Sequence, residues 1–105
     1  MRRALAIALL ALLLPACSPW RATRLYADGT RALDAGRTEQ AIGDLEQAAV
    51  LMPASGEVQN HLGIAYLQAG RKRDARDAFA RAVALNCSNP SARSNLELLD
   101  RELGR

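Results

Sequence analysis

The stretch Gly56–Val83, GEVQNHLGIAYLQAGRKRDARDAFARAV, carries the clearest helical pattern in the chain. On both sides of Gly70, apolar side chains recur every three to four residues, which is the spacing of one face of a helix. These residues are Val58, Leu62, Ala65 and Tyr66 before the glycine, and Ala75, Ala78, Phe79, Ala82 and Val83 after it. The connection over residues 70–73 is short, so the two helices are predicted to pack as antiparallel neighbours.

The same pattern occurs 34 residues earlier in the chain. The pairs in register are Gly29 with Gly63, Gly36 with Gly70, Ala41 with Ala75, Leu45 with Phe79, and Ala48 with Ala82. A fixed period of this length is typical of stacked helical hairpins. Thr38 is expected to cap the second helix of the earlier unit. No segment alternates with a period of two for long enough to predict a strand.

A fifth helix is predicted to begin at Asn89 and Pro90, because asparagine is a good capping residue and proline suits the first helical position. Its apolar positions are Ala92, Leu96, Leu99 and Leu103. The charged residues between them would face solvent, as the open end of a stack requires. We therefore interpret this segment as a closing helix.

The repeated unit resembles the tetratricopeptide repeat. The matching residues are Leu62, Gly63, Tyr66, Gly70, Ala75, Phe79 and Ala82 in the second unit, and Gly29, Ala32, Gly36, Ala41, Leu45, Ala48 and Pro53 in the first. Asp28 and Cys87 depart from the family pattern, at its leucine and proline positions. The resemblance implies an all-α fold, a short right-handed solenoid of two antiparallel helix pairs at 22–55 and 56–89 with a C-terminal capping helix at 90–105.

The first sixteen residues resemble an export signal. Two arginines precede an apolar run, Ala4 to Leu14, which is shorter than the roughly 20 residues needed to cross a bilayer. The sequence Leu14-Pro15-Ala16-Cys17 resembles the lipobox of bacterial lipoproteins, although Pro15 is unusual there. This resemblance implies cleavage before Cys17, acylation of its thiol, and a lipidated tether over 17–21. The alternative is an ordinary secretory leader in which Cys17 is a chance thiol.

Charge and the residue after the cysteine add expectations about location and partners. Without Arg2 and Arg3 the chain has 12 Lys and Arg against 11 Asp and Glu, so the net charge of +3 is largely an effect of the leader. We therefore predict no nucleic-acid partner. The lipoprotein resemblance implies a membrane anchor at Cys17, and Ser18 favours the outer membrane, facing the periplasm. The basic turn at 71–76 is predicted to be solvated, because aspartates interleave with its charges.

The chain offers little for catalysis. His61 is its only histidine, and Cys87 is its only cysteine besides Cys17. A Cys87–His61 pair would lie about one repeat apart with no orienting third group, so we predict no enzyme and no catalytic residues. No metal-ligand spacing or phosphate-binding loop occurs, so neither a metal nor a cofactor is expected. Cys87 is expected to lie half-buried between helices, and a thiol-dependent enzyme is kept as an alternative.

The tetratricopeptide resemblance implies a protein-binding groove along the first helix of each unit. The residues carried over to it are Tyr26, Thr30, Leu33, Asn60, His61, Ile64, Leu67, Gln68 and Asn95. For each residue, ordinary solvent-facing helix surface is the alternative. The expected function is a lipid-anchored adaptor for an unidentified protein or peptide of the bacterial cell envelope, with pilus or secretion-complex assembly as the first role to test. The alternative is a self-associating structural lipoprotein, a homo-oligomer, because solenoids generally need about three repeats.

Overall fold

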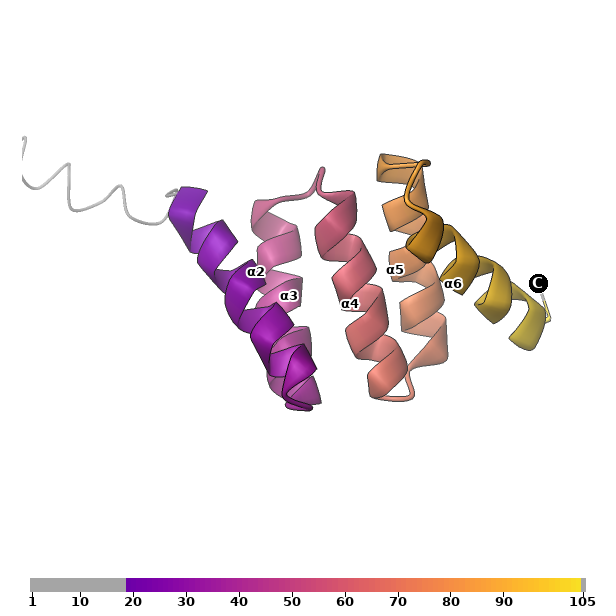
Figure 1. The fold of residues 1–105 in the computed structure, drawn as a ribbon, viewed down its shortest axis with the longest axis horizontal. Helices are drawn as coiled ribbons and strands as arrows, with labels where there is room; N and C mark the ends of the chain where they lie inside the picture. The colour runs from indigo at the N-terminus through magenta and orange to yellow at the C-terminus, as the bar shows by residue number, and fades with distance from the viewer. Residues whose placement is uncertain (1–18, 105) are drawn as a thin grey trace, which may run out of the picture.

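The computed structural model describes residues 19–104. Within this range the chain forms five α-helices and no strand: α2 (Pro19–Asp34), α3 (Thr38–Leu51), α4 (Gly56–Gln68), α5 (Lys72–Leu85) and α6 (Pro90–Glu102). Figure 1 shows the helices as a row that follows chain order. The prediction of an all-α fold is confirmed for the described residues.

Each helix packs against the next one along the chain. The most extensive contacts lie within two pairs, α2 with α3 and α4 with α5, while α3–α4 and α5–α6 contacts join the pairs and the last helix. One core cluster of buried apolar side chains runs from Ala32 to Leu99 and includes residues of every helix. The arrangement is compatible with a helical-repeat fold.

The two predicted turns inside the pairs have the same geometry. Gly36 and Gly70 both have φ of +76°, a left-handed conformation that favours glycine. After each glycine, a backbone N–H donates to a carbonyl in the last turn of the preceding helix: Arg37 to Ala32 and Arg71 to Tyr66, both at 2.8 Å. These bonds satisfy carbonyls that the helix end leaves free, so the turn conformation is fixed locally.

Glycine also lets the helices of each pair approach closely. A Cβ atom at Gly63 would lie 2.7 Å from Cε1 of Phe79, and one at Gly29 would lie 2.7 Å from Cγ of Leu45. Both distances are shorter than any van der Waals contact, so only glycine fits unless the neighbour moves. The 34-residue register therefore places glycine against the large core residue of the partner helix in both pairs.

The start of α6 agrees with the prediction from the sequence, whereas the start of α3 does not. Asn89 caps α6, because its Oδ1 accepts from the Ala92 N–H at 3.1 Å. The prediction that Thr38 caps α3 is wrong. Arg37 occupies the cap position without a side-chain bond, and Thr38 is already helical. Thr38 thus lies one residue after the cap position, and its hydroxyl donates to Oε1 of Gln68 at 2.8 Å.

Of the segments predicted at the N-terminus, the structure describes only the part that lies in α2. This helix begins at Pro19 and so includes the last three residues of the segment expected as a tether. The export signal, the lipobox and Cys17 lie outside the described residues. No helix within 19–104 combines the length and the apolar character that a membrane span needs.

Candidate binding surface

Tyr26 and His61 connect α2 to α4 on the predicted groove face. The Tyr26 hydroxyl oxygen lies 3.1 Å from Nδ1 of His61, and the two rings meet edge to face with centroids 5.3 Å apart. The same Nδ1 lies 3.0 Å from the Glu57 carbonyl oxygen, so the ring tautomer sets which of the two bonds forms. Burial and the Glu57 carboxylate raise the pKa of Tyr26 to about 12, so its hydroxyl stays protonated at neutral pH.

Asn60, which precedes His61 in α4, is a buried polar residue. It is 8% exposed, and its Oδ1 has no hydrogen-bond partner among the residues that the structure describes. A buried acceptor left without a donor costs about 1–3 kcal/mol. Ile64 and Leu67 follow at helical spacing and lie only partly buried beside the core. This atom is shielded from solvent, so a ligand donor meets it only after the Asn60 side chain turns toward the groove, whereas Ile64 and Leu67 offer apolar contacts as they stand.

The other predicted groove residues lie in different environments. Leu33 belongs to the core and is 6% exposed, so it is not open to a ligand. The Thr30 hydroxyl donates to the Ala27 carbonyl within α2, at 3.0 Å. Gln68 is exposed at the end of α4 and accepts the bond from Thr38. Asn95 is partly exposed on α6, which packs against α5. The structure thus brings together Tyr26 and His61, and it places Asn60, Ile64 and Leu67 along one helix face.

Sequence reasoning missed the contact between Tyr66 and Glu46. The Tyr66 hydroxyl donates to Oε1 of Glu46 at 2.9 Å, and the Arg71 guanidinium lies 4.7 Å from the centre of the Tyr66 ring. Burial and the Glu46 carboxylate raise the pKa of Tyr66 to about 12. The Tyr66–Glu46 hydrogen bond therefore joins α4 to α3. No local signal marks Glu46, which in the sequence is one of several charged helix residues.

The basic cluster at the start of α5 consists of Arg71, Lys72, Arg73 and Arg76. Its ion pairs are Arg71–Asp74 at 2.8 Å, Lys72–Glu102 at 2.9 Å, Arg76–Asp100 at 2.7 Å and Arg76–Asp77 at 3.4 Å. Within the described part of the chain, Arg73 is the one member without an ion pair. Neighbouring carboxylates therefore compensate most of this positive charge, which limits its attraction for distant anions.

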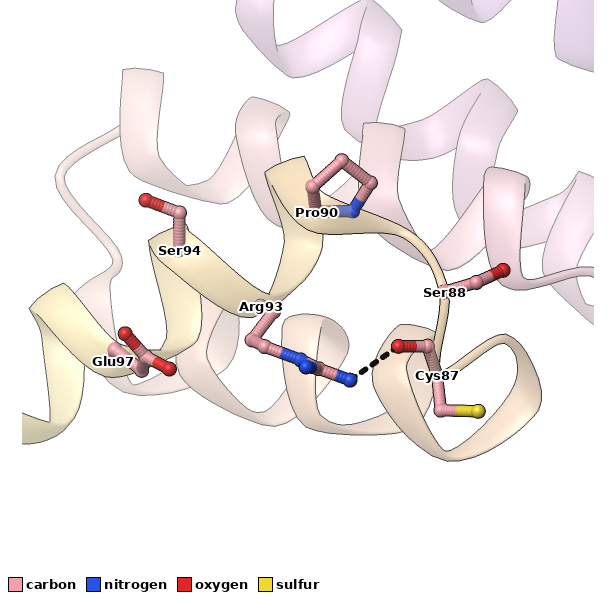
Figure 2. A pocket seen from close by; sticks show the side chains of 6 residues that line it. All are labelled: Cys87, Ser88, Pro90, Arg93, Ser94 and Glu97. Atoms are coloured by element: carbon pink, nitrogen blue, oxygen red, sulfur yellow. Dashed lines mark hydrogen bonds between the residues drawn. The ribbon is translucent and has the colours of Figure 1, made fainter.

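A hollow of about 230 Å³ lies at the junction of α5 and α6 (Figure 2). It is lined by Cys87, Ser88, Pro90, Arg93, Ser94 and Glu97. The Arg93 side chain reaches back to donate to the Cys87 carbonyl. The expectation of a half-buried Cys87 is wrong, because the residue lies in the exposed loop after α5. His61 lies against Tyr26 instead, so no contact in the structure joins it to Cys87.

A protein metal site needs several ligand side chains close together. Within 19–104, no group of three or more His, Cys, Asp or Glu side chains gathers as a metal ion would require.

A comparison with known protein families identifies the family to which the chain belongs. Residues 41–101, from α3 to α6, match the Est1 DNA/RNA binding domain. The match covers more than half of the chain. The chain belongs to the Est1 DNA/RNA binding domain family. No curated protein matches this Est1-family chain.

The family match corrects two expectations. The identification as a tetratricopeptide lipoprotein is wrong, because the matched family is a different one. Small residues at helix crossings and turns suit any stack of antiparallel helices, so the 34-residue period was not specific for one family. The match gives no support to an export signal or a lipobox. The prediction of no nucleic-acid partner is also wrong, because the family is named for binding DNA or RNA.

Proposed function

We propose that this Est1-family chain is a small helical adaptor that binds a segment of another polypeptide along α4, on the face shared with α2. The observation that carries the proposal is the buried Oδ1 of Asn60, which no donor satisfies within residues 19–104. The atom is shielded from solvent, so we infer that the Asn60 side chain turns outward when a polypeptide binds and that a main-chain N–H of the ligand then satisfies the acceptor.

The neighbours of Asn60 support a polypeptide ligand. Ile64 and Leu67 offer partly buried apolar surface one and two turns further along α4. Tyr26 and His61 provide a protonated hydroxyl and an imidazole beside this strip. Apolar side chains flanked by a few polar groups are the usual composition of a peptide-binding groove.

The test uses a photoreactive residue in place of Ile64 in the full chain, with crosslinking in cells and mass spectrometry of the adducts. The control places the same residue at Gln40, an exposed position of α3. We expect a specific polypeptide adduct from position 64 and none from position 40.

Asn60→Leu then separates binding from folding. The variant removes the unsatisfied acceptor, so its melting temperature should stay unchanged or rise, while the adduct at position 64 weakens. Equal adducts from both probe positions, or an undiminished adduct in Asn60→Leu, would count against the proposal.

Binding of DNA or RNA is the second candidate, and the family match favours it. Arg73, the member of the basic cluster that has no ion pair within residues 19–104, is exposed and would contact phosphate. In that case the affinity for single-stranded RNA or DNA should fall with salt, and Arg73→Gln should weaken it and reduce the salt dependence. We rank it second because carboxylates engage the other three members of the basic cluster.

One finer expectation belongs to the same proposal, namely the right-handed sense of a solenoid built from the 34-residue unit.

A further inference from the structure

We propose that the polypeptide bound along α4 carries a basic side chain, a lysine or an arginine, which pairs with the carboxylate of Glu57. This inference rests on the proposed function and names the chemistry of its ligand. Glu57 is an exposed residue in the first turn of α4, about one turn before Asn60 and His61. We call Tyr26, Glu57, Asn60 and His61 the acidic subsite.

The residues of the acidic subsite lie together where α2 meets α4. Asn60 and His61 follow Glu57 by three and four positions, so the three side chains leave the same side of the helix. Nδ1 of His61 lies 3.0 Å from the Glu57 carbonyl oxygen and 3.1 Å from the Tyr26 hydroxyl oxygen. Burial, and after it the Glu57 carboxylate, raise the pKa of Tyr26 to about 12, so this carboxylate acts on the same hydroxyl.

Within residues 19–104, no ion pair engages the carboxylate of Glu57. Glu57 is also the only Asp, Glu, Lys or Arg in α4. Other carboxylates of the structure, such as Asp28, Asp74 and Asp100, pair with arginines of the chain itself. A cation brought by a ligand therefore meets a carboxylate that has no partner to give up.

The carboxylate is a feature of α4 and not of the repeated unit. In the 34-residue register, Glu57 corresponds to Thr23 of α2 and to Ser91 of α6. Both residues are uncharged and both lie in helices, so a helix at this place in the stack forms without an acid. The repeated fold therefore does not account for the charge of Glu57.

A lysine or arginine side chain suits the groups of the acidic subsite. Its N–H groups donate charge-assisted bonds to a carboxylate, and its charge is attracted to the face of a tyrosine ring, here the partly buried Tyr26. The same carboxylate repels the phosphates of DNA or RNA, so a basic polypeptide suits this face better than a nucleic acid.

The spacing along α4 adds a constraint on the ligand. Ile64 follows Glu57 by seven positions, which is about 10 Å along the helix axis. An extended chain covers this distance in about three residues. The ligand is therefore expected to carry its basic residue about three positions from an apolar residue that contacts Ile64.

The experiment selects binders from a library of random dodecapeptides displayed on phage, with the full chain immobilised. Parallel selections use the wild type, Glu57→Lys and Glu39→Lys. Glu39 is the matched control, because it is also an exposed acid in the first turn of its helix, α3. We expect the wild type and Glu39→Lys to enrich peptides with the predicted basic and apolar residues. Glu57→Lys should instead enrich Asp or Glu at the basic position.

Glu57→Gln gives a second measurement with an uncharged side chain of nearly the same size. It should weaken binding of a synthetic peptide from the wild-type pool about fivefold. It should have no effect on a version of the peptide in which glutamine replaces the basic residue. Undiminished affinity in Glu57→Gln, or basic peptides enriched by Glu57→Lys as strongly as by the wild type, would overturn the inference.

A selection on Ile64→Arg distinguishes failure of this inference from failure of the proposed function. If Ile64→Arg enriches the same peptides as the wild type, or if the wild type enriches none, the proposed function fails and this inference fails with it. If enrichment depends on Ile64 but the peptides carry no excess of lysine or arginine, only this inference fails.

Discussion

Gly63 and Phe79 show how one pair of residues sets the distance between two helices. The Phe79 ring is fully buried, and three of its carbon atoms lie within 3 Å of where a Cβ of Gly63 would be. A buried ring in a close-packed core has little room to move aside. The glycine is therefore required by packing, since its helical backbone needs no left-handed conformation.

We predict opposite effects for two glycine-to-alanine substitutions. Gly63→Ala should lower the free energy of unfolding by about 1–3 kcal/mol, because the methyl group overlaps the Phe79 ring. Gly43→Ala should raise it by about 0.5–1 kcal/mol, because Gly43 is an exposed helical residue with no atom within 4 Å of the added Cβ. Urea unfolding of both variants measures the difference. Equal stability of the two would contradict the packing role of Gly63.

The closing helix α6 is attached mainly by buried apolar side chains. Ala92 is fully buried and Leu99 is 2% exposed. The Arg76–Asp100 pair also joins α6 to α5, but both side chains retain about a quarter to a third of their exposure. Ion pairs this accessible to water contribute about 1 kcal/mol or less. Apolar burial therefore dominates the attachment of this element.

Neighbouring leucines of α6 should behave differently when truncated. Leu99→Ala should cost about 2–5 kcal/mol and expose the amides of α6 to hydrogen exchange, because it removes the largest buried side chain of the helix. Leu98→Ala should cost about 0.5 kcal/mol or less, because Leu98 is 51% exposed. Hydrogen exchange of both variants by mass spectrometry tests this. If α6 amides stayed equally protected in both, α6 would be held by something other than Leu99.

At the scale of the whole molecule, the helices share one core. The cluster of buried residues continues from α2 through α6 without a break. A domain this small buries a modest fraction of its surface, so its total stability is expected near the lower end of about 5–15 kcal/mol. Damage at the centre of the cluster should therefore reach every helix.

Phe79→Ala tests this continuity. The substitution should cost about 3–5 kcal/mol, because Phe79 is the largest fully buried side chain. That loss is comparable with the stability of the domain, so the variant should be largely unfolded in a circular dichroism melt that the wild type completes in one cooperative transition. A variant that melts like the wild type, or that loses only α4 and α5, would show that the helices do not form one cooperative unit.

The sequence alone was sufficient for features that depend on neighbours along the chain. Gly36, Gly70 and Asn89 define turns and a helix start through bonds that reach only a few residues away. The apolar spacing around Phe79 predicted the core face of each helix, because helix geometry maps sequence positions to directions in space. Thr38 is an exception, because a shift of one residue in the helix start is enough to change what its hydroxyl contacts.

Only the tertiary structure decided what depends on how the helices are placed against one another. Within residues 19–104 it buried Leu33, left Oδ1 of Asn60 without a donor, and joined Tyr26 to His61 and Tyr66 to Glu46. Each of these outcomes is set by the rotation and separation of two helices, to which many residues contribute small amounts. A periodic sequence specifies that helices pack through their apolar faces, but the positions at the edge of such a face become core or surface only when the neighbouring helix is in place.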